Sequence, residues 1–428
     1  MLKKVIIFAI LSALLFSSFS FISGAFEVDK SEATVEGYYL YDLNHNLLMQ
    51  SENIDNRISP SSTAKIMATC VILESNIDFT QKITVTKAML SNVAGRSMLL
   101  KEGNVLTVED LLYAMLCGGY NDATHILALT VSSSLSDFSK KMNEKAIELE
   151  MNDTHYLNPT GIDVSGMYTT INDIAKLARH MANNQVFVDI CSTKSYRLSK
   201  DSICDYTTIT NRSSLLNDYK GLSSFNVGSS DSGDCAVIFY QTSELALISI
   251  VMNAKSNDEN AKINYAEKYS KKLISHAINN YSTKLIKSQN DVVISLPVKY
   301  SMSSNEINVY LQKDLTLFLS DEISIDEDLT YSIYIHNGEL IAPIKSGDII
   351  GTLTVFYDGV MLANVPLIVE ESIDRNAFLY SMDIIKQFIL SKTFLITLML
   401  FLILIIYNSK SRKHKFRKKK RKIRKKPT

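Results

Sequence analysis

The sequence is poor in the residues that mark several specialised protein classes. It holds 15 Gly, 6 Pro and 5 Cys among 428 residues, of which 46% are hydrophobic. The low Gly and Pro counts exclude collagen-like and low-complexity chains, and the hydrophobic fraction excludes intrinsic disorder. Five cysteines are too few for a disulfide scaffold and cannot all pair, although a bond between Cys191 and Cys204 stays open. The composition indicates globular domains, and the length favours two.

Motifs for metals and nucleotides are also missing. The seven histidines form no HExxH motif, the cysteines form no CxxC pair, and the chain has neither a Walker loop nor a GxGxxG motif. Zinc enzymes and nucleotide-binding domains typically carry such arrangements. We therefore expect no metal and no cofactor.

The net charge is zero, but the charges are unevenly distributed. Of the 45 Lys and Arg, 13 lie in residues 410–428 and two more are Lys3 and Lys4, which leaves 30 basic residues against 45 acids elsewhere. A nucleic-acid-binding domain needs a basic surface on its folded part, and this chain has an acidic one. We therefore expect no nucleic-acid partner.

Both ends of the chain carry membrane signals. Residues 1–25 combine a basic start, an apolar run and small residues at Ser23 and Ala25, which predicts a signal peptide cleaved after Ala25. Residues 388–407 form an almost uncharged segment long enough to span a bilayer of ~30 Å. The basic tail 408–428 follows, and the positive-inside rule places it in the cytoplasm. The pattern predicts a single-pass cell-membrane protein with a C-terminal anchor and an extracytoplasmic body.

The residues between these signals divide into two regions. From 28 to 282, hydrophobic periodicity predicts an α+β domain with helices packed on an antiparallel sheet. From 290 to 370, short runs rich in Val, Ile, Leu and Tyr without helices predict a small β-sandwich. In the first region we predict a hairpin around 44–46, helices over 61–76, 108–130, 135–148, 170–183 and 260–278, and strands over 35–40, 196–198, 206–209, 235–241 and 245–253. In the second we predict strands over 291–298, 306–311, 314–319, 329–336, 349–357 and 360–369.

The segment Ser59-Pro60-Ser61-Ser62-Thr63-Ala64-Lys65 carries an SxxK motif at a predicted helix start, with Ser59 as the N-cap. Ser62 and Lys65 then lie on one face of the first turns. A serine hydroxyl needs a base to become a nucleophile, and a lysine serves as one only when burial lowers its pKa. The same helix end positions the backbone N–H of Ser62 to stabilise an oxyanion. Alone, SxxK is a weak signal, because most occurrences are surface helix starts.

Further motifs make the signal specific. Residues 98–103 (MLLKEG), 106–116 (LTVEDLLYAML), 121–123 (NDA), 158–161 (NPTG) and 168–170 (YTT) resemble the penicillin-binding serine D-Ala-D-Ala carboxypeptidases of peptidase family S11. The resemblance implies a penicillin-binding/β-lactamase-like transpeptidase domain, followed by a β-rich domain and an anchor. It also implies removal of the terminal D-alanine from peptidoglycan stem peptides through an acyl-enzyme, and binding of β-lactams. Ser62 matches the nucleophile, Lys65 the general base and Asn121 the residue that orients the substrate.

Two motifs of the family are altered. The SxN triplet is replaced by Gly119-Tyr120-Asn121, which removes a hydroxyl that relays a proton. Tyr120 could contact the substrate, but an aromatic residue at such a position is more often a packing residue. The KTG triplet aligns with Asn226-Val227-Gly228, so the ammonium and the hydroxyl that hold the substrate's terminal carboxylate in this mechanism class are both absent. Ser229, Ser230 and Lys220 are nearby candidates to replace them.

Three hypotheses follow. The chain is a working D,D-carboxypeptidase with altered third-motif chemistry, since Ser62, Lys65 and Asn121 are intact. Alternatively, it is a degenerate relative that binds cell-wall peptide or a protein partner without efficient turnover. A β-lactamase or esterase with the same nucleophile is disfavoured by the additional β domain and the anchor, which a diffusible hydrolase does not need.

Overall fold

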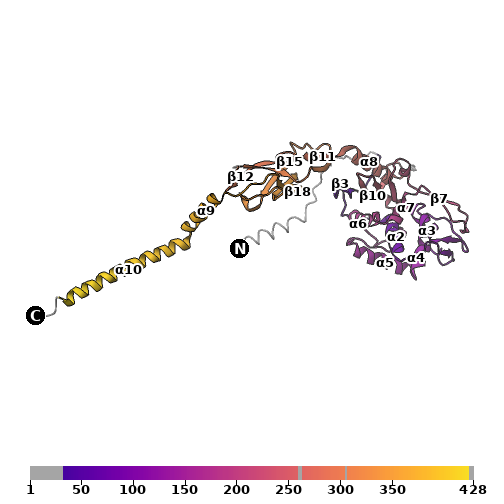
Figure 1. The fold of residues 1–428 in the computed structure, drawn as a ribbon. Coiled ribbons are helices and arrows are strands. Elements are labelled where there is room, and N and C mark those ends of the chain that lie inside the picture. Colours follow the sequence, from indigo (N-terminus) through magenta and orange to yellow (C-terminus); the bar gives the residue numbers. More distant parts are fainter. Residues whose placement is uncertain (1–31, 259–262, 304–305, 424–428) are drawn as a thin grey trace. The chain divides into compact units, whose positions relative to one another are not determined.

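The computed structural model describes residues 32–258, 263–303 and 306–423 (Figure 1). The chain divides into two compact units. The first comprises the described residues up to Thr283 together with Phe318–Ser324, and the second comprises the remainder. The predicted signal peptide, residues 1–25, lies outside the described residues.

An antiparallel sheet forms the centre of the first unit. Its strand order is β3-β2-β10-β9-β8, and β1 pairs with the end of β10. The hairpin predicted around residues 44–46 is confirmed, since it joins β2 to β3. The strands of the unit are β1 (Ala33–Thr34), β2 (Gly37–Asp42), β3 (Leu47–Glu52), β4 (Lys82–Thr84), β5 (Val105–Thr107), β6 (Ser195–Arg197), β7 (Thr208–Thr210), β8 (Leu222–Ser230), β9 (Gly233–Gln241) and β10 (Ala246–Ser256).

The helices of this unit follow the predicted periodicity with two main exceptions, one of which is α7, a helix that was not predicted. The predicted helix 135–148 is confirmed at both ends. The predicted helix 108–130 is wrong as a single element, because a turn at 117–120 separates two helices and Gly119 there has a φ of +71°. The helices are η2 (Ser61–Thr63), α2 (Ala64–Glu74), α3 (Val108–Leu116), α4 (Asn121–Val131), α5 (Leu135–Glu148), α6 (Ile171–Ala182), α7 (Gln185–Ser192), η3 (Leu215–Asn217) and α8 (Tyr265–Asn280).

Both faces of the sheet are covered, because alternate strand residues feed two separate cores. Tyr39 and Ile250 face the larger core, which also contains the buried residues of α2–α6. Leu40 and Val251, their neighbours in sequence, face a second core formed with α8. This alternation is what a central strand buried on both faces requires. The predicted packing of helices on an antiparallel sheet is therefore confirmed.

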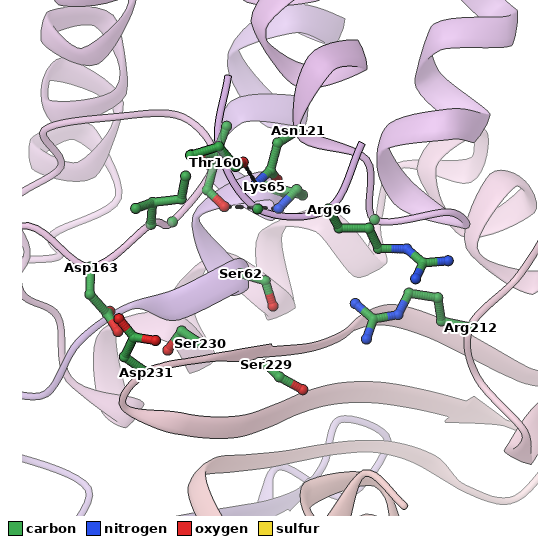
Figure 2. A pocket seen from close by; sticks show the side chains of 15 residues that line it. Ser62, Lys65, Arg96, Asn121, Thr160, Asp163, Arg212, Ser229, Ser230 and Asp231 are labelled. Carbon is green, nitrogen blue, oxygen red and sulfur yellow. Dashed lines mark hydrogen bonds between the residues drawn. The ribbon is translucent and has the colours of Figure 1, made fainter. Parts of the chain in front are cut away.

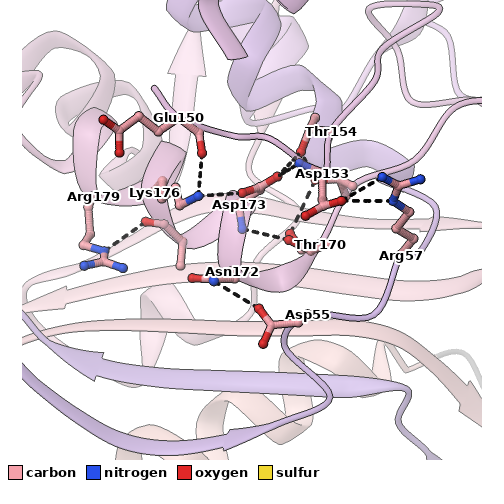
Figure 3. A network of polar contacts seen from close by, with 12 residues as sticks. Asp55, Arg57, Glu150, Asp153, Thr154, Thr170, Asn172, Asp173, Lys176 and Arg179 are labelled. Atoms are coloured by element: carbon pink, nitrogen blue, oxygen red, sulfur yellow. Dashed lines mark hydrogen bonds and ion pairs between the residues drawn. The ribbon is translucent and has the colours of Figure 1, made fainter. Parts of the chain in front are cut away.

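A polar network around the start of α6 secures the segment that leads into η2 (Figure 3). Thr170 caps α6 by accepting the backbone N–H of Asp173. The Asp173 carboxylate in turn accepts from the Asp153 N–H at 2.9 Å and from Lys176 at 2.9 Å. Ile58 exchanges two backbone hydrogen bonds with Thr169, beside this network. The chain therefore enters the SxxK segment from a fixed position.

The second unit is mainly β-structure. Its larger sheet has the strand order β15-β17-β18-β13-β12-β16, while β11 pairs with β14. Three predicted strands, 306–311, 349–357 and 360–369, are confirmed at both ends. Its elements are β11 (Tyr281–Lys287), β12 (Ile294–Lys299), β13 (Glu306–Leu311), β14 (Leu315–Ser320), β15 (Leu329–Ile335), η4 (His336–Gly338), β16 (Leu340–Ile341), β17 (Ile349–Tyr357), β18 (Val360–Val369), α9 (Ala377–Leu390) and α10 (Lys392–Ile423).

The first part of α10 is strongly apolar. Residues Lys392–Lys410 are long and apolar enough to cross a membrane, with a mean hydropathy of 1.9. This segment overlaps the predicted span 388–407 and makes α10 a candidate membrane anchor.

Candidate active site

The SxxK serine stands at a strained turn where α2 begins. Ser61 adopts a left-handed φ of +48°, so a 3-10 turn comes first and the α-helix starts only at Ala64. A Cβ at Gly161 would lie 1.6 Å from the Ser61 carbonyl oxygen, so only glycine fits beside this turn. The predicted N-cap at Ser59 is wrong, because the 3-10 turn has Pro60 at its N-cap position. The Ser59 hydroxyl instead donates to the Asp163 carboxylate and accepts the Ser61 N–H at 3.2 Å.

Strand β8 brings the third-motif segment against the nucleophile. The Asn226 side-chain amide donates to the Ser62 Oγ at 3.0 Å, and the Cys235 Sγ lies 3.0 Å from the same oxygen. A Cβ at Gly228 would stand 1.8 Å from the Ser62 Oγ, so the strand approaches this closely only because residue 228 has no side chain. The Ser62 hydroxyl is thereby held in one orientation.

Lys65 is buried one turn after Ser62. Its side chain is 5% exposed, and its Nζ donates to the Thr160 carbonyl at 2.8 Å. Burial lowers the pKa of the Lys65 ammonium to about 7; nearby Cys235 opposes this shift and the Arg212 charge adds to it. The lowered pKa favours the neutral amine near pH 7, which is the state that a general base requires.

Ser62 and Lys65 line one cavity of about 320 Å³ (Figure 2). The other walls are segments 94–96 and 160–163, residues Gly119 and Asn121, Arg212, and the end of β8 with the following turn, 229–231. Figure 2 shows the acidic residues Asp163 and Asp231 on one side of Ser62, and Arg96 and Arg212 on the other. The cavity therefore has opposite charges at its two ends.

Asn121 starts α4 with its side chain in the cavity wall. Its Nδ2 donates to the Ala94 carbonyl at 2.8 Å, while its Oδ1 is buried and has no hydrogen-bond partner among the described residues. A buried acceptor without a partner is costly unless a ligand or water satisfies it. Tyr120 beside it packs on the first core and under the Arg96 guanidinium, in agreement with the packing role read from the sequence.

The structure brings most of the predicted residues together, with two exceptions. Val227 alternates to the opposite face of β8 and packs in the second core with α8, so it does not line the cavity with Ser62. Lys220 lines a separate hollow beside α7. Ser229 and Ser230 do line the cavity. The roles of all these residues remain predictions.

Sequence reasoning missed Arg96 and Arg212. Arg96 belongs to the loop between β4 and β5, and Arg212 to the loop between β7 and η3, and neither lies in an altered motif. Only the fold places both beside Ser62. No periodicity or spacing in the sequence links positions 96 and 212.

Cys235 contacts Ser62, whereas the residues of a possible metal cluster lie apart from the cavity. All five cysteines, which belong to the described residues, are unpaired thiols, so Cys191 and Cys204 are not joined. Cys70, Glu74 and His180 hold ligand atoms close together at the far end of α2. Glu74 already pairs with Lys145 at 2.6 Å, and burial raises the pKa of the Cys70 thiol to about 12. A cation would have to displace that ammonium and the thiol proton.

Comparison with known proteins gives one consistent result. Curated relatives include the D-alanyl-D-alanine carboxypeptidase DacF of Bacillus subtilis (strain 168), which is 26% identical over 346 residues that cover 78% of this chain and 84% of the relative. DacC of Escherichia coli (strain K12), also a D-alanyl-D-alanine carboxypeptidase, is 24% identical over 82% of this chain and 87% of its own length.

Solved structures show the same fold. The D-alanyl-D-alanine carboxypeptidase DacD from Francisella tularensis matches with a TM-score of 0.59 and 20% identity, over 82% of this chain and 95% of that one. Penicillin binding protein 5 from Haemophilus influenzae matches with a TM-score of 0.56 and 21% identity, over 82% of this chain and all of that one.

Family profiles cover both units of the chain. The C-terminal domain of penicillin-binding protein 5 matches residues 281–375. The D-alanyl-D-alanine carboxypeptidase family, peptidase family S11, matches residues 25–256, which is more than half of the sequence. The chain therefore belongs to the D-alanyl-D-alanine carboxypeptidase family.

Proposed function

We propose that the chain is a serine-type D-Ala-D-Ala carboxypeptidase that acts on peptidoglycan stem peptides through an acyl-enzyme on Ser62. The observation that carries this proposal is that Ser62 and the buried Lys65, whose pKa burial lowers to about 7, line the same cavity. The related D-alanyl-D-alanine carboxypeptidases support the same activity and a role in cell-wall biogenesis.

In the acylation step, neutral Lys65 takes the Ser62 proton while the Ser62 Oγ attacks the carbonyl carbon of the penultimate D-alanine. The backbone N–H of Ser62, at the start of the helix, is the proposed donor to the oxyanion. The Lys65 ammonium then returns its proton to the leaving amine, and free D-alanine departs. The unpartnered Oδ1 of Asn121 is the proposed acceptor for an N–H of the substrate backbone.

In the deacylation step, water must attack the ester with help from a base. Gly119 offers no hydroxyl to relay the proton, so Lys65 alone has to activate the water. A missing relay costs ~10²–10⁴ in rate. We therefore expect acylation to outpace deacylation, so that the acyl-enzyme accumulates.

A second candidate function is peptide binding without efficient turnover. Gly119 and Asn226 favour it, since each replaces a group that the family uses in catalysis or in carboxylate binding. In this case Ser62 would still react with β-lactams, but the protein would release no D-alanine.

Two measurements on the full-length protein in detergent distinguish these functions. Fluorescent penicillin should label the protein covalently, and Ser62→Ala should abolish the label. A stem pentapeptide ending in D-Ala-D-Ala should then yield D-alanine, with an initial burst that reports the accumulating acyl-enzyme. Absence of label in the unmutated protein contradicts the nucleophile assignment, whereas label without D-alanine release favours the binding function.

We propose further that the body of the protein lies outside the cytoplasm, held by a single C-terminal span. The apolar segment Lys392–Lys410 and the 13 basic residues of 410–428 support this orientation through the positive-inside rule. Relatives named as D-alanyl-D-alanine carboxypeptidases, and the match to the penicillin-binding protein 5 C-terminal domain, are consistent with a membrane-associated location. A C-terminal tag that is protected from protease in intact cells would support the orientation.

A further inference from the structure

The cationic end of the cavity is formed by two guanidinium groups from different loops. Arg96 and Arg212 both line the cavity that contains Ser62, and the Arg96 charge acts on Arg212. Figure 2 shows the two side chains approaching each other beside Ser62. Two like charges at close range repel each other, so an anion between them would be bound favourably.

Neither guanidinium forms an ion pair within the part of the chain that the structure describes. Arg96 donates from its Nε to the Gly118 carbonyl at 2.7 Å and lies over the Tyr120 ring at 5.0 Å. The carboxylates whose charges act on Arg212 are those of Asp234 and Glu267. Asp234 accepts from Ser229 and Tyr265, and Glu267 accepts from the 213–215 loop, so both are satisfied elsewhere. The two guanidinium groups therefore keep donors for a ligand.

The backbone that carries Arg212 is fixed on both sides. Its own N–H donates to the Cys117 carbonyl at 3.0 Å. Its neighbour Ser213 donates to the buried Glu267 carboxylate at 2.6 Å, and the Ser213 N–H donates to the Asn211 side chain at 3.0 Å. A side chain on a fixed loop loses less freedom on binding, so the anion site is preorganised.

Arg212 packs against Gly119, where the SxN motif would carry its serine. A Cβ at Gly119 would lie 3.1 Å from the Arg212 Cδ and 3.2 Å from its Nη1, and it would require a strained φ of +71°. A serine at this position would therefore crowd the guanidinium. The side chain of Arg212 therefore packs directly against the position where the motif serine would stand.

We propose that Arg96 and Arg212 together bind the terminal carboxylate of the substrate, in place of the lysine and threonine that the third motif lacks. This assignment rests on the proposed function, which supplies a substrate ending in D-Ala-D-Ala. Planar guanidinium groups donate paired hydrogen bonds to a carboxylate, which the neutral Asn226 amide on β8 cannot match. The carboxylate receptor of this chain thus lies on two loops rather than on the strand.

The test uses full-length Ser62→Ala protein in detergent, which binds peptide but cannot be acylated. Isothermal titration calorimetry compares diacetyl-L-Lys-D-Ala-D-Ala as the free acid with the same peptide as the C-terminal carboxamide. We expect the acid to bind about 10- to 100-fold more tightly, as for two charge-assisted hydrogen bonds. Arg96→Met and Arg212→Met should each reduce this ratio, and the double variant should bring it close to one.

Two further variants make the test specific. Lys220→Met removes a nearby cation that lines a different hollow, and it should leave the ratio unchanged. Gly119→Ser should lower the acid-to-amide affinity ratio by crowding Arg212. Arg212→Lys keeps the positive charge and should retain part of the preference for the acid. Thermal unfolding of each variant checks that it is folded.

The assignment is overturned if the acid and the amide bind equally, if the acid shows no measurable binding, or if the double variant keeps the preference. These results do not depend on turnover. A preference for the acid without any D-alanine release would uphold the carboxylate receptor and reject the carboxypeptidase function. Release of D-alanine with an unchanged ratio in the double variant would uphold the carboxypeptidase function and reject the carboxylate receptor.

Discussion

The pH dependence of acylation tests the role of Lys65 most directly, because the lysine is active only when neutral. With a pKa of about 7, roughly one tenth of the amines are neutral at pH 6 and roughly nine tenths at pH 8. The acylation rate constant should therefore rise about tenfold between these two values and then level off. A lysine with its ordinary pKa of 10.5 would instead give a rate that climbs about tenfold for each pH unit through pH 9.

Stopped-flow measurement with a fluorescent penicillin at saturating concentration supplies this rate constant. Two variants move the midpoint in opposite directions. Arg212→Met removes a cation that lowers the pKa of Lys65, so the midpoint should shift to higher pH. Cys235→Ala removes a group that raises the same pKa, so the midpoint should shift to lower pH.

Lys65→Met should slow acylation by ~10²–10⁴, the usual contribution of a positioned base. The reasoning is refuted if Lys65→Met retains the same rate and the same midpoint. It is also refuted if the unmutated protein shows a rate that still climbs between pH 8 and pH 9.

Three further predictions concern single positions and the anchor. Gly228→Ala should reduce penicillin labelling at least ~100-fold without unfolding the protein, because its Cβ would stand 1.8 Å from the Ser62 Oγ; retained labelling would show that β8 can withdraw. Gly161→Ala should lower the free energy of unfolding by at least ~2 kcal/mol in urea titrations, because its Cβ meets the Ser61 carbonyl at 1.6 Å in a left-handed conformation. Truncation after Leu390 should release the protein into the soluble fraction, whereas retention in the membrane would place the anchor elsewhere.

The sequence was sufficient for features that depend on local patterns. Strict hydrophobic periodicity located α5 at both ends, and the SxxK spacing identified two residues that do share one cavity. The helix predicted over 108–130 failed because hydrophobicity continues across Gly118 and Gly119, where the backbone turns. Periodicity reports which residues are apolar and does not report a change in backbone conformation.

Features that depend on the three-dimensional fold were not accessible in this way. The strained φ of Ser61 occurs beside Gly161, which is 100 positions away in the chain. The paired arginines come from loops that precede different elements. The family alignment placed Asn226 and Gly228 beside Ser62, but it could not show that Val227 faces α8.

The buried amine of Lys65 links the energetics of folding to the chemistry. The unfolded chain holds the proton of this lysine up to its ordinary pKa of 10.5, while the folded chain releases it at about 7. The unfolded state therefore binds more protons between these values, so this residue makes folding more favourable as pH rises through that range. Below pH 7 the burial of the charged form costs on the order of 5 kcal/mol, comparable to the net stability of a typical domain. The rest of the fold must supply this energy. A better-solvated lysine with an ordinary pKa would therefore give a more stable protein with a less reactive serine.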